Sequence, residues 1–316
     1  PSGPARSAES GKHLTEPLEP DSGGPRWRLA SMTGPRRRIL LGVAVVVFVI
    51  AATIAIKNFP HNATKHAHWW LFAVVGLAGP ILTILLNGAE YVSQARIVDV
   101  HVPFGEGIRI SVLGTAANLL PVPGSALVRT HALATSGQGY KRATKTTVIV
   151  GGAWIGTTAV LAAILGLTTG AKAAAAPVAV IGIALLIAAW VFIKRAQPAS
   201  GPGDVFRRLV LVEAGTACVG AARFFGVLYA LGISVSAGQA MALALTSVIA
   251  SAAGVFPAGI GIREALAGAV SAVVGLPAAA GVVAAAADRV AGLIVLAVIT
   301  AILVARNQSL STPVGR

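Results

Sequence analysis

The sequence predicts an all-α membrane protein, a polytopic helical bundle with about six full transmembrane helices and two re-entrant broken-helix hairpins. Hydrophobic residues make up 55% of its 316 residues and charged residues only 11%, with a mean hydropathy of +0.79. An ordinary soluble domain carries about 25% charged residues. Glycine is abundant and aromatic residues are few, which favours helices packed through small residues over a membrane barrel with aromatic girdles.

The net charge of +14 does not by itself indicate nucleic-acid binding, and we expect no nucleic-acid partner. Its lysines and arginines lie mostly in short segments between apolar runs, which is typical of the cytoplasmic loops of membrane proteins. One cysteine, Cys218, leaves no intrachain disulfide or cysteine metal site. His61, His66 and His68 lie together beside two tryptophans but without acidic companions, so we expect no metal there. No catalytic or cofactor motif is recognisable, and we expect neither an enzyme nor a cofactor.

Three regions follow from the composition along the chain. Residues 1–35 are rich in Pro, Ser and Gly and predict a disordered tail, residues 36–305 form a single transmembrane domain, and residues 306–316 form a second disordered tail. A bilayer-spanning helix needs about 20 apolar residues. Six segments reach or approach that length: 39–56, 69–89, 146–169, 173–193, 209–231 and 278–305.

Two further apolar tracts, 108–135 and 238–275, are interrupted near their centres and predict pairs of half-helices. The interruptions are Pro121, Pro123 and Gly124 in the first tract, and Pro257, Gly259 and Gly261 in the second. Loop charges favour hairpins that return to the side on which they began, with both termini cytoplasmic. The cytoplasmic side then collects the N-terminal tail, Arg96, Lys141, Arg142, Lys145, Lys194, Arg195, Arg207, Arg208, Arg306 and Arg316, while only Lys57, Lys65 and Lys172 stay outside.

The two interrupted tracts share a short motif. Five residues separate Pro123 from Arg129, and five separate Pro257 from Arg263. Hairpins that start from opposite sides and share a motif predict an inverted repeat, the arrangement with which transporters build a site from broken helices near the bilayer midplane.

Buried charges supply the candidate binding residues. Arginine offers a planar fork of donors that fits a phosphate, and the N–H groups at the start of each second half-helix would add to it. The alternative is that these charges pair with one another and hold the bundle together, for example Arg263 or Arg289 with Glu213 or Asp288. The candidates are Arg109, Arg129, Arg223, Arg263 and Arg289, with the acids Glu90, Glu213, Glu264 and Asp288.

Helix geometry constrains the partners of these charges. Asp288 and Arg289 are adjacent and point about 100° apart on a helix, so each needs a partner on another helix. Glu213 lies near the start of its apolar span, where we interpret it as a solvated boundary residue, and Arg223 lies deeper. The predicted substrate-binding set is Pro123, Gly124, Arg129, Arg223, Pro257, Gly259, Gly261, Arg263, Glu264, Asp288 and Arg289.

Three stretches carry a family resemblance: NLLPVPGSALVRTHAL at 118–133, YALGISVSAGQAMALALTSVIASAAGVFPAGIGIREAL at 229–266, and the last helix with Asp288 and Arg289. Together they resemble the lysylphosphatidylglycerol synthase transmembrane-region family of flippase-like proteins over roughly residues 36–305. The resemblance implies lipid movement across the bacterial cytoplasmic (inner) membrane. Two departures are Ala258 at a usual glycine position and an uncharged TTVIVGGAWIG where the family often has charges.

The predicted function is translocation of a membrane phospholipid or lipid-linked glycan, with Arg129 and Arg263 holding an anionic headgroup. Eleven residues follow Ala305, so we expect no aminoacyl-transferase domain and no lipid aminoacylation. One alternative is a membrane enzyme acting on polyprenyl (pyro)phosphate, because PVPGSALVR is similar to a phosphatase loop, although the arginine comes late and paired glutamates are missing. A second alternative is a non-transporting scaffold for envelope glycolipid assembly.

Overall fold

The structure, a computed structural model, describes residues 68–118, 123–167, 172–253 and 261–310, and the statements below concern these residues. Their regular structure is entirely helical. The predicted span at 39–56 and both predicted tails, apart from 306–310, lie outside the described residues.

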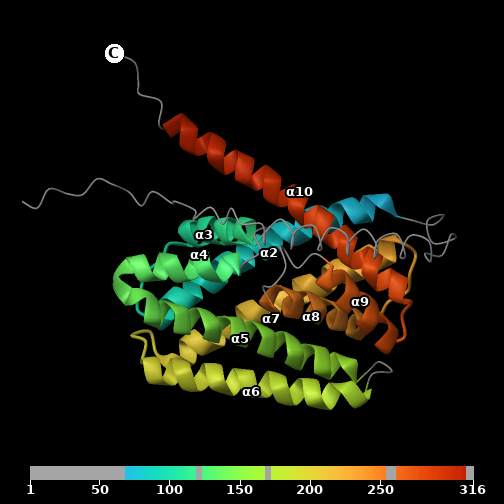
Figure 1. The fold of residues 1–316 in the computed structure, drawn as a ribbon, viewed down its shortest axis with the longest axis horizontal. Helices are drawn as coiled ribbons and strands as arrows, with labels where there is room; N and C mark the ends of the chain where they lie inside the picture. The colour runs from blue at the N-terminus through green and yellow to red at the C-terminus, as the bar shows by residue number, and fades with distance from the viewer. Residues whose placement is uncertain (1–67, 119–122, 168–171, 254–260, 311–316) are drawn as a thin grey trace, which may run out of the picture. The chain divides into compact units, whose positions relative to one another are not determined.

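Five long helices form the body of the bundle (Figure 1): α2 (Trp69–Ile97), α5 (Gly139–Gly166), α6 (Lys172–Ala196), α7 (Pro202–Ala230) and α10 (Ala278–Leu310). Each belongs to a stretch that is long and apolar enough to cross a membrane. These stretches coincide with five of the six predicted spans, and the chain is a multi-pass membrane protein. The start of α5 and α7 at Gly139 and Pro202 is earlier than predicted, because their charged first turns are helical too.

The interrupted tracts each form two shorter helices, as the prolines and glycines predict. The first tract gives α3 (Phe104–Ala117) and α4 (Gly124–Leu133), and the second gives α8 (Ala237–Ala253) and α9 (Ile262–Val273). A bend at η2 (Ala134–Gln138) joins α4 to α5, where Gly137 has a φ of 89° that favours glycine. The bend turns α5 back along α4 (Figure 1).

Both pairs of short helices fold back on themselves. A Cβ atom on Gly124 would lie 2.2 Å from the backbone of Ala117, so the start of α4 presses directly on the end of α3. In the second pair, the Gln239 side chain near the start of α8 donates to the Val274 carbonyl, just after α9, at 2.9 Å. The start of α8 therefore lies beside the end of α9.

Small residues bring the long helices together, as the composition suggests. A Cβ atom on Gly156 of α5 would lie 2.8 Å from the carbonyl oxygen of Gly182 on α6. A Cβ atom on Gly182 would likewise lie 2.8 Å from the carbonyl oxygen of Gly156. The antiparallel α2 and α7 approach in the same manner, since Gly226 faces Val75 and Gly215 faces Leu86. Such contacts stabilise helix pairs where lipid removes much of the hydrophobic driving force.

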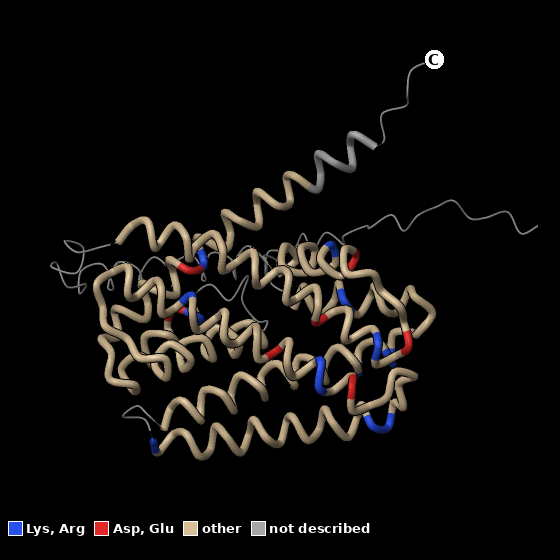
Figure 2. Tube along the Cα trace, turned by 180° about the vertical axis from the view of Figure 1, so that it is seen from behind, with Lys and Arg blue, Asp and Glu red and all other residues tan. Residues whose placement is uncertain are grey.

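Basic residues near the ends of α2 and α7 meet at one end of the bundle. Arg96 and Arg208 line a shared pocket of about 430 Å³, and the Asp99 side chain accepts a hydrogen bond from Ala199 N–H at 2.7 Å. At the opposite ends of the same two helices, His68 N–H donates to the Ala230 carbonyl. Figure 2 shows that most of the remaining helical trace carries no charge.

Candidate functional site

The buried charges form two groups, both of which include a residue of α7. The Asp288 cluster comprises Arg223, Arg263, Glu264, Asp288 and Arg289. The Arg129 cluster comprises Glu90, Arg129 and Glu213. Glu213 and Arg223 are ten positions apart on α7, which places the two clusters about 15 Å apart along that helix.

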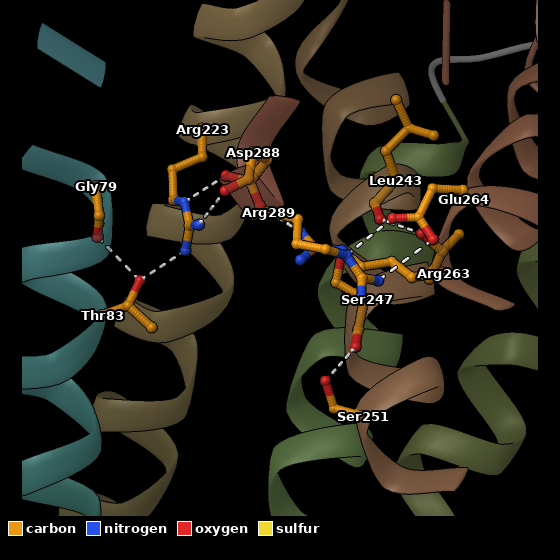
Figure 3. A network of polar contacts seen from close by, with 11 residues as sticks. Gly79, Thr83, Arg223, Leu243, Ser247, Ser251, Arg263, Glu264, Asp288 and Arg289 are labelled. Atoms are coloured by element: carbon orange, nitrogen blue, oxygen red, sulfur yellow. Dashed lines mark hydrogen bonds and ion pairs between the residues drawn. The ribbon is translucent and has the colours of Figure 1, made fainter. Parts of the chain in front are cut away.

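Asp288 on α10 is the centre of its cluster and is only 4% exposed. Its Oδ1 accepts Arg223 Nε at 2.6 Å, and its Oδ2 accepts Arg263 Nη2 (Figure 3). Arg223 also donates from Nη1 to the Thr83 hydroxyl at 3.1 Å, and this hydroxyl donates to the Gly79 carbonyl at 2.9 Å. One polar chain therefore links α2, α7, α10 and α9.

The neighbouring pair joins α9 to α10. Arg289 Nε lies 2.9 Å from Glu264 Oε1, and Arg289 Nη2 donates to Oε2 at 3.3 Å. Asp288 and Arg289 thus each find partners on other helices, as their 100° offset predicts: Asp288 on α7 and α9, and Arg289 on α9. The interpretation of the charges as mutual partners is confirmed for Arg263 with Asp288. Arg289 forms its ion pair with Glu264, a partner that this hypothesis did not name.

The Asp288 cluster holds more cationic than anionic side chains. Among the described residues, its ion pairs join three guanidinium groups to two carboxylates, one more cation than anion. Arg263 has the most exposed of the three side chains, at 17%, and lies over the Phe224 ring at 5.7 Å. Its Nε has no hydrogen-bond partner among the described residues. Arg263 is therefore the member of the cluster best placed to contact an additional anion.

The Arg129 cluster is built around a two-pronged ion pair between α4 and α2. Arg129 Nη1 donates to Glu90 Oε1 at 2.6 Å and Nη2 to Oε2 at 2.9 Å. Both residues are buried, with 8% and 5% exposure. This bidentate geometry uses the guanidinium fork fully.

Glu213 is the third member and corrects one prediction. It is 0% exposed, and neither carboxylate oxygen has a hydrogen-bond partner among the described residues, so it is no solvated boundary residue. The prediction failed because α7 begins at Pro202, which places Glu213 about three turns inside the helix. Glu90 and Arg129 are the charged groups that act on it electrostatically.

One backbone N–H near the start of each second half-helix is bonded within the chain. We expected free backbone N–H groups there, but Ser125 N–H donates to Asn118 Oδ1 at 2.7 Å and Gly261 N–H donates to Glu264 Oε2 at 2.9 Å. Gly261 has a φ of 84°, and with Glu264 it forms the N-terminal cap of α9. These N–H groups serve helix capping within the chain.

The remaining candidate residues belong to neither cluster or lie outside the described residues. Pro123 is exposed just before α4, while Gly124 is buried and permits the close contact with α3. Arg109 is exposed and lies 3.8 Å from Glu106, so it is no member of either cluster. Pro257 and Gly259 lie outside the described residues.

Sequence reasoning missed the partner of Arg129 and its polar surroundings. Gln94, which is 0% exposed, donates to the Thr147 hydroxyl at 2.7 Å, and Thr130 donates to the same oxygen at 3.0 Å. Glu90 follows the apolar run 69–89 directly, so hydropathy placed it at a span end although α2 continues to Ile97. The helical spacing of Glu90, Gln94 and Ile97 on one face was the available signal.

Comparison with models of known protein families and with curated protein sequences found no match. The family resemblance therefore stays a prediction from the motifs. Within the described ranges, no group of three or more His, Cys, Asp or Glu side chains could hold a metal ion.

Proposed function

We propose that the chain translocates a lipid or a lipid-linked substrate between membrane leaflets, and that the Asp288 cluster binds its anionic headgroup. Ionisable residues within membrane-spanning helices are costly, and their default interpretation is a substrate or ion pathway. The cluster gathers five of the predicted site residues from α7, α9 and α10.

The observation that carries this proposal is the unequal number of charges in the cluster. A cluster that only held helices together would be best served by equal numbers of cations and anions, because an uncompensated buried charge is strongly unfavourable. Here, among the described residues, three arginines face two carboxylates, and Arg263 Nε has no hydrogen-bond partner. A phosphate or carboxylate group would neutralise the excess charge and accept this N–H.

The short helices support the proposed re-entrant topology. The 14 residues of α3 and the 10 of α4 extend about 21 Å and 15 Å, and the 12 of α9 about 18 Å, all less than the roughly 30 Å of hydrocarbon. Each hairpin would then return to its own side, in an inverted repeat. The basic residues shared by one end of α2 and α7 favour that end as the cytoplasmic side of a bacterial cytoplasmic membrane.

The test is lipid movement in vesicles that contain the purified full chain. A fluorescent phosphatidylglycerol placed in one leaflet reports translocation when a membrane-impermeant reductant quenches the exposed fraction. We expect Arg263→Ala to abolish translocation and Arg263→Lys to reduce it, because lysine keeps the charge but loses the planar fork.

Arg109→Ala is the matched control. Arg109 is also an arginine within an apolar tract, but its side chain is exposed and lies outside the cluster. We expect it to translocate lipid as the wild type does. Undiminished translocation by a folded Arg263→Ala protein would refute the proposed role of the cluster.

A further inference from the structure

Glu213 combines complete burial with a lack of partners, and the proposed lipid site does not use it. Its side chain is 0% exposed, and both carboxylate oxygens lack a hydrogen-bond partner among the described residues. Burial in such surroundings costs far more free energy for an ionised carboxylate than for a neutral carboxylic acid, because the charge loses its hydration and gains no counter-ion contact among the described residues. The neutral, protonated form is therefore the one that this environment favours.

The charges around Glu213 point to the same protonation state. Arg129 offers one positive charge, and Glu90 and Glu213 offer two negative charges when both are ionised. Both Nη atoms of Arg129 are used by Glu90. The cluster is neutral only when it holds one proton, and Glu213, which has no ion pair in the part of the chain that the structure describes, is the place for it.

Helix packing places Glu213 beside the part of α2 that carries Glu90, the partner of Arg129. α2 and α7 are antiparallel, and Gly215 of α7 faces Leu86 of α2, so Glu213 lies level with the part of α2 that leads into Glu90. Arg129 Nε, the one nitrogen of this guanidinium without a hydrogen-bond partner among the described residues, supplies an N–H that could bond a second carboxylate.

We propose that Glu213 is a proton-binding site, and that loss of its proton lets its carboxylate compete with Glu90 for Arg129. In the proton-bound state, Glu213 carries a carboxylic acid and Glu90 holds the guanidinium. On release, the O–H bond breaks, the proton passes to water, and the carboxylate that remains takes a hydrogen bond from Arg129. The two states differ by one proton and by the carboxylate that the arginine favours.

A pocket lies on the α2 and α7 segments that carry the two carboxylates, toward the end of the bundle where Arg96 and Arg208 lie. The pocket of about 430 Å³ at the end of α2 and α7 is lined by Ala89 and Val212, the chain neighbours of Glu90 and Glu213. Ser93, Arg96 and Arg208 line it further out.

Other titratable groups on the elements packed against α7 lie at helix ends, belong to the Asp288 cluster, or lie near Glu90 on α2. The described part of α8 carries none, and those of α5 and α6 lie at helix ends: Tyr140, Lys141, Arg142, Lys145, Lys172, Lys194 and Arg195. On α10, Asp288 and Arg289 belong to the Asp288 cluster. On α2, the buried Tyr91 follows Glu90, and Arg96 lies at the pocket.

A proton fits this site better than a metal cation does. Calcium takes six to eight oxygen ligands and magnesium six in near-octahedral geometry. Glu213 is one unpartnered carboxylate, and within the described ranges no group of three or more potential metal-ligating side chains exists. A proton needs a single oxygen atom.

Infrared difference spectroscopy of the purified full chain in lipid bilayers tests the proposal, because a protonated carboxylic acid has a C=O stretching band distinct from that of a carboxylate. We expect a pH-dependent acid band in the wild type that is absent from Glu213→Gln. Glu264→Gln is the matched control, because Glu264 is equally buried but ion-paired, and it should keep the band. A band that persists in Glu213→Gln refutes the assignment.

A second variant tests the link to Arg129 separately. Glu90→Gln removes the present partner of the guanidinium, so Glu213 should ionise to replace it and the acid band should disappear at neutral pH. An unchanged band in folded Glu90→Gln would refute the competition for Arg129. A metal cation is the alternative occupant. If sodium and not acid stabilises the wild type, and Glu213→Gln loses this stabilisation, the site binds a metal cation and the proposed proton site is refuted. None of these readouts requires lipid translocation, so they stand apart from the test of the proposed function.

Discussion

Arg129 of α4 and Glu90 of α2 form a bidentate ion pair, with N–O distances of 2.6 and 2.9 Å, between a short helix and a long one. Both side chains are buried. This pair fastens the first broken tract to the body of the bundle. The second broken tract is fastened in a related manner, since Arg263 of α9 pairs with Asp288 of α10. The two arginines that follow the shared proline motif thus both anchor a short helix to a long one.

Loss of Arg129 should destabilise the protein strongly. Arg129→Ala leaves the Glu90 carboxylate buried without its partner, and breaking a buried pair in this way costs about 3–5 kcal/mol of unfolding free energy. Thermal unfolding of the purified protein, followed by intrinsic fluorescence, measures the loss. The double variant Arg129→Ala/Glu90→Ala should recover part of it, and a double variant less stable than Arg129→Ala would contradict the ion-pair interpretation.

The Asp288 cluster should show a graded response to substitution. Asp288→Asn removes the charge that two arginines share, and we expect a loss of about 3–5 kcal/mol. Thr83→Val removes one hydroxyl that bonds Arg223, with an expected loss of about 1 kcal/mol. Thr83→Ser keeps the hydroxyl and serves as the control. Equal losses for Asp288→Asn and Thr83→Val would show that Asp288 is no centre of the network.

The contact between α5 and α6 should tolerate no methyl group. Gly156→Ala places a Cβ 2.8 Å from the Gly182 carbonyl oxygen, and the backbone must shift at a cost of about 1–3 kcal/mol. Gly151→Ala on the same helix has nothing within 4 Å of its new Cβ and should be neutral or slightly stabilising. Melting temperatures of the two variants give the comparison, and similar values would contradict the close approach.

The proposed topology predicts where single cysteines react. In a Cys218→Ala background, Lys141→Cys before the body of α5 and Ser234→Cys between α7 and α8 are both exposed positions. We expect an impermeant thiol reagent added to whole cells to label Ser234→Cys, and Lys141→Cys to react only after the membrane is opened. Labelling of both from the same side would overturn the hairpin arrangement.

Hydropathy alone located most of the fold. The five long helices and the two broken tracts follow from apolar run length and from proline and glycine positions, because lipid requires each spanning segment to satisfy its own backbone hydrogen bonds. Helix ends were less well predicted, as the early start of α7 at Pro202 shows, because charged first turns are polar in composition but helical in structure.

The sequence by itself determined that this chain is a helical membrane protein, that its helices break near Pro123 and Pro257, and that its buried arginines need partners. Tertiary structure decided which partners these are. Glu90 lies 39 positions from Arg129, and Asp288 lies 65 positions from Arg223, so no local periodicity relates them. It also decided that Glu213 has none among the described residues, because burial of a side chain depends on the helices packed around it and not on its place in an apolar run.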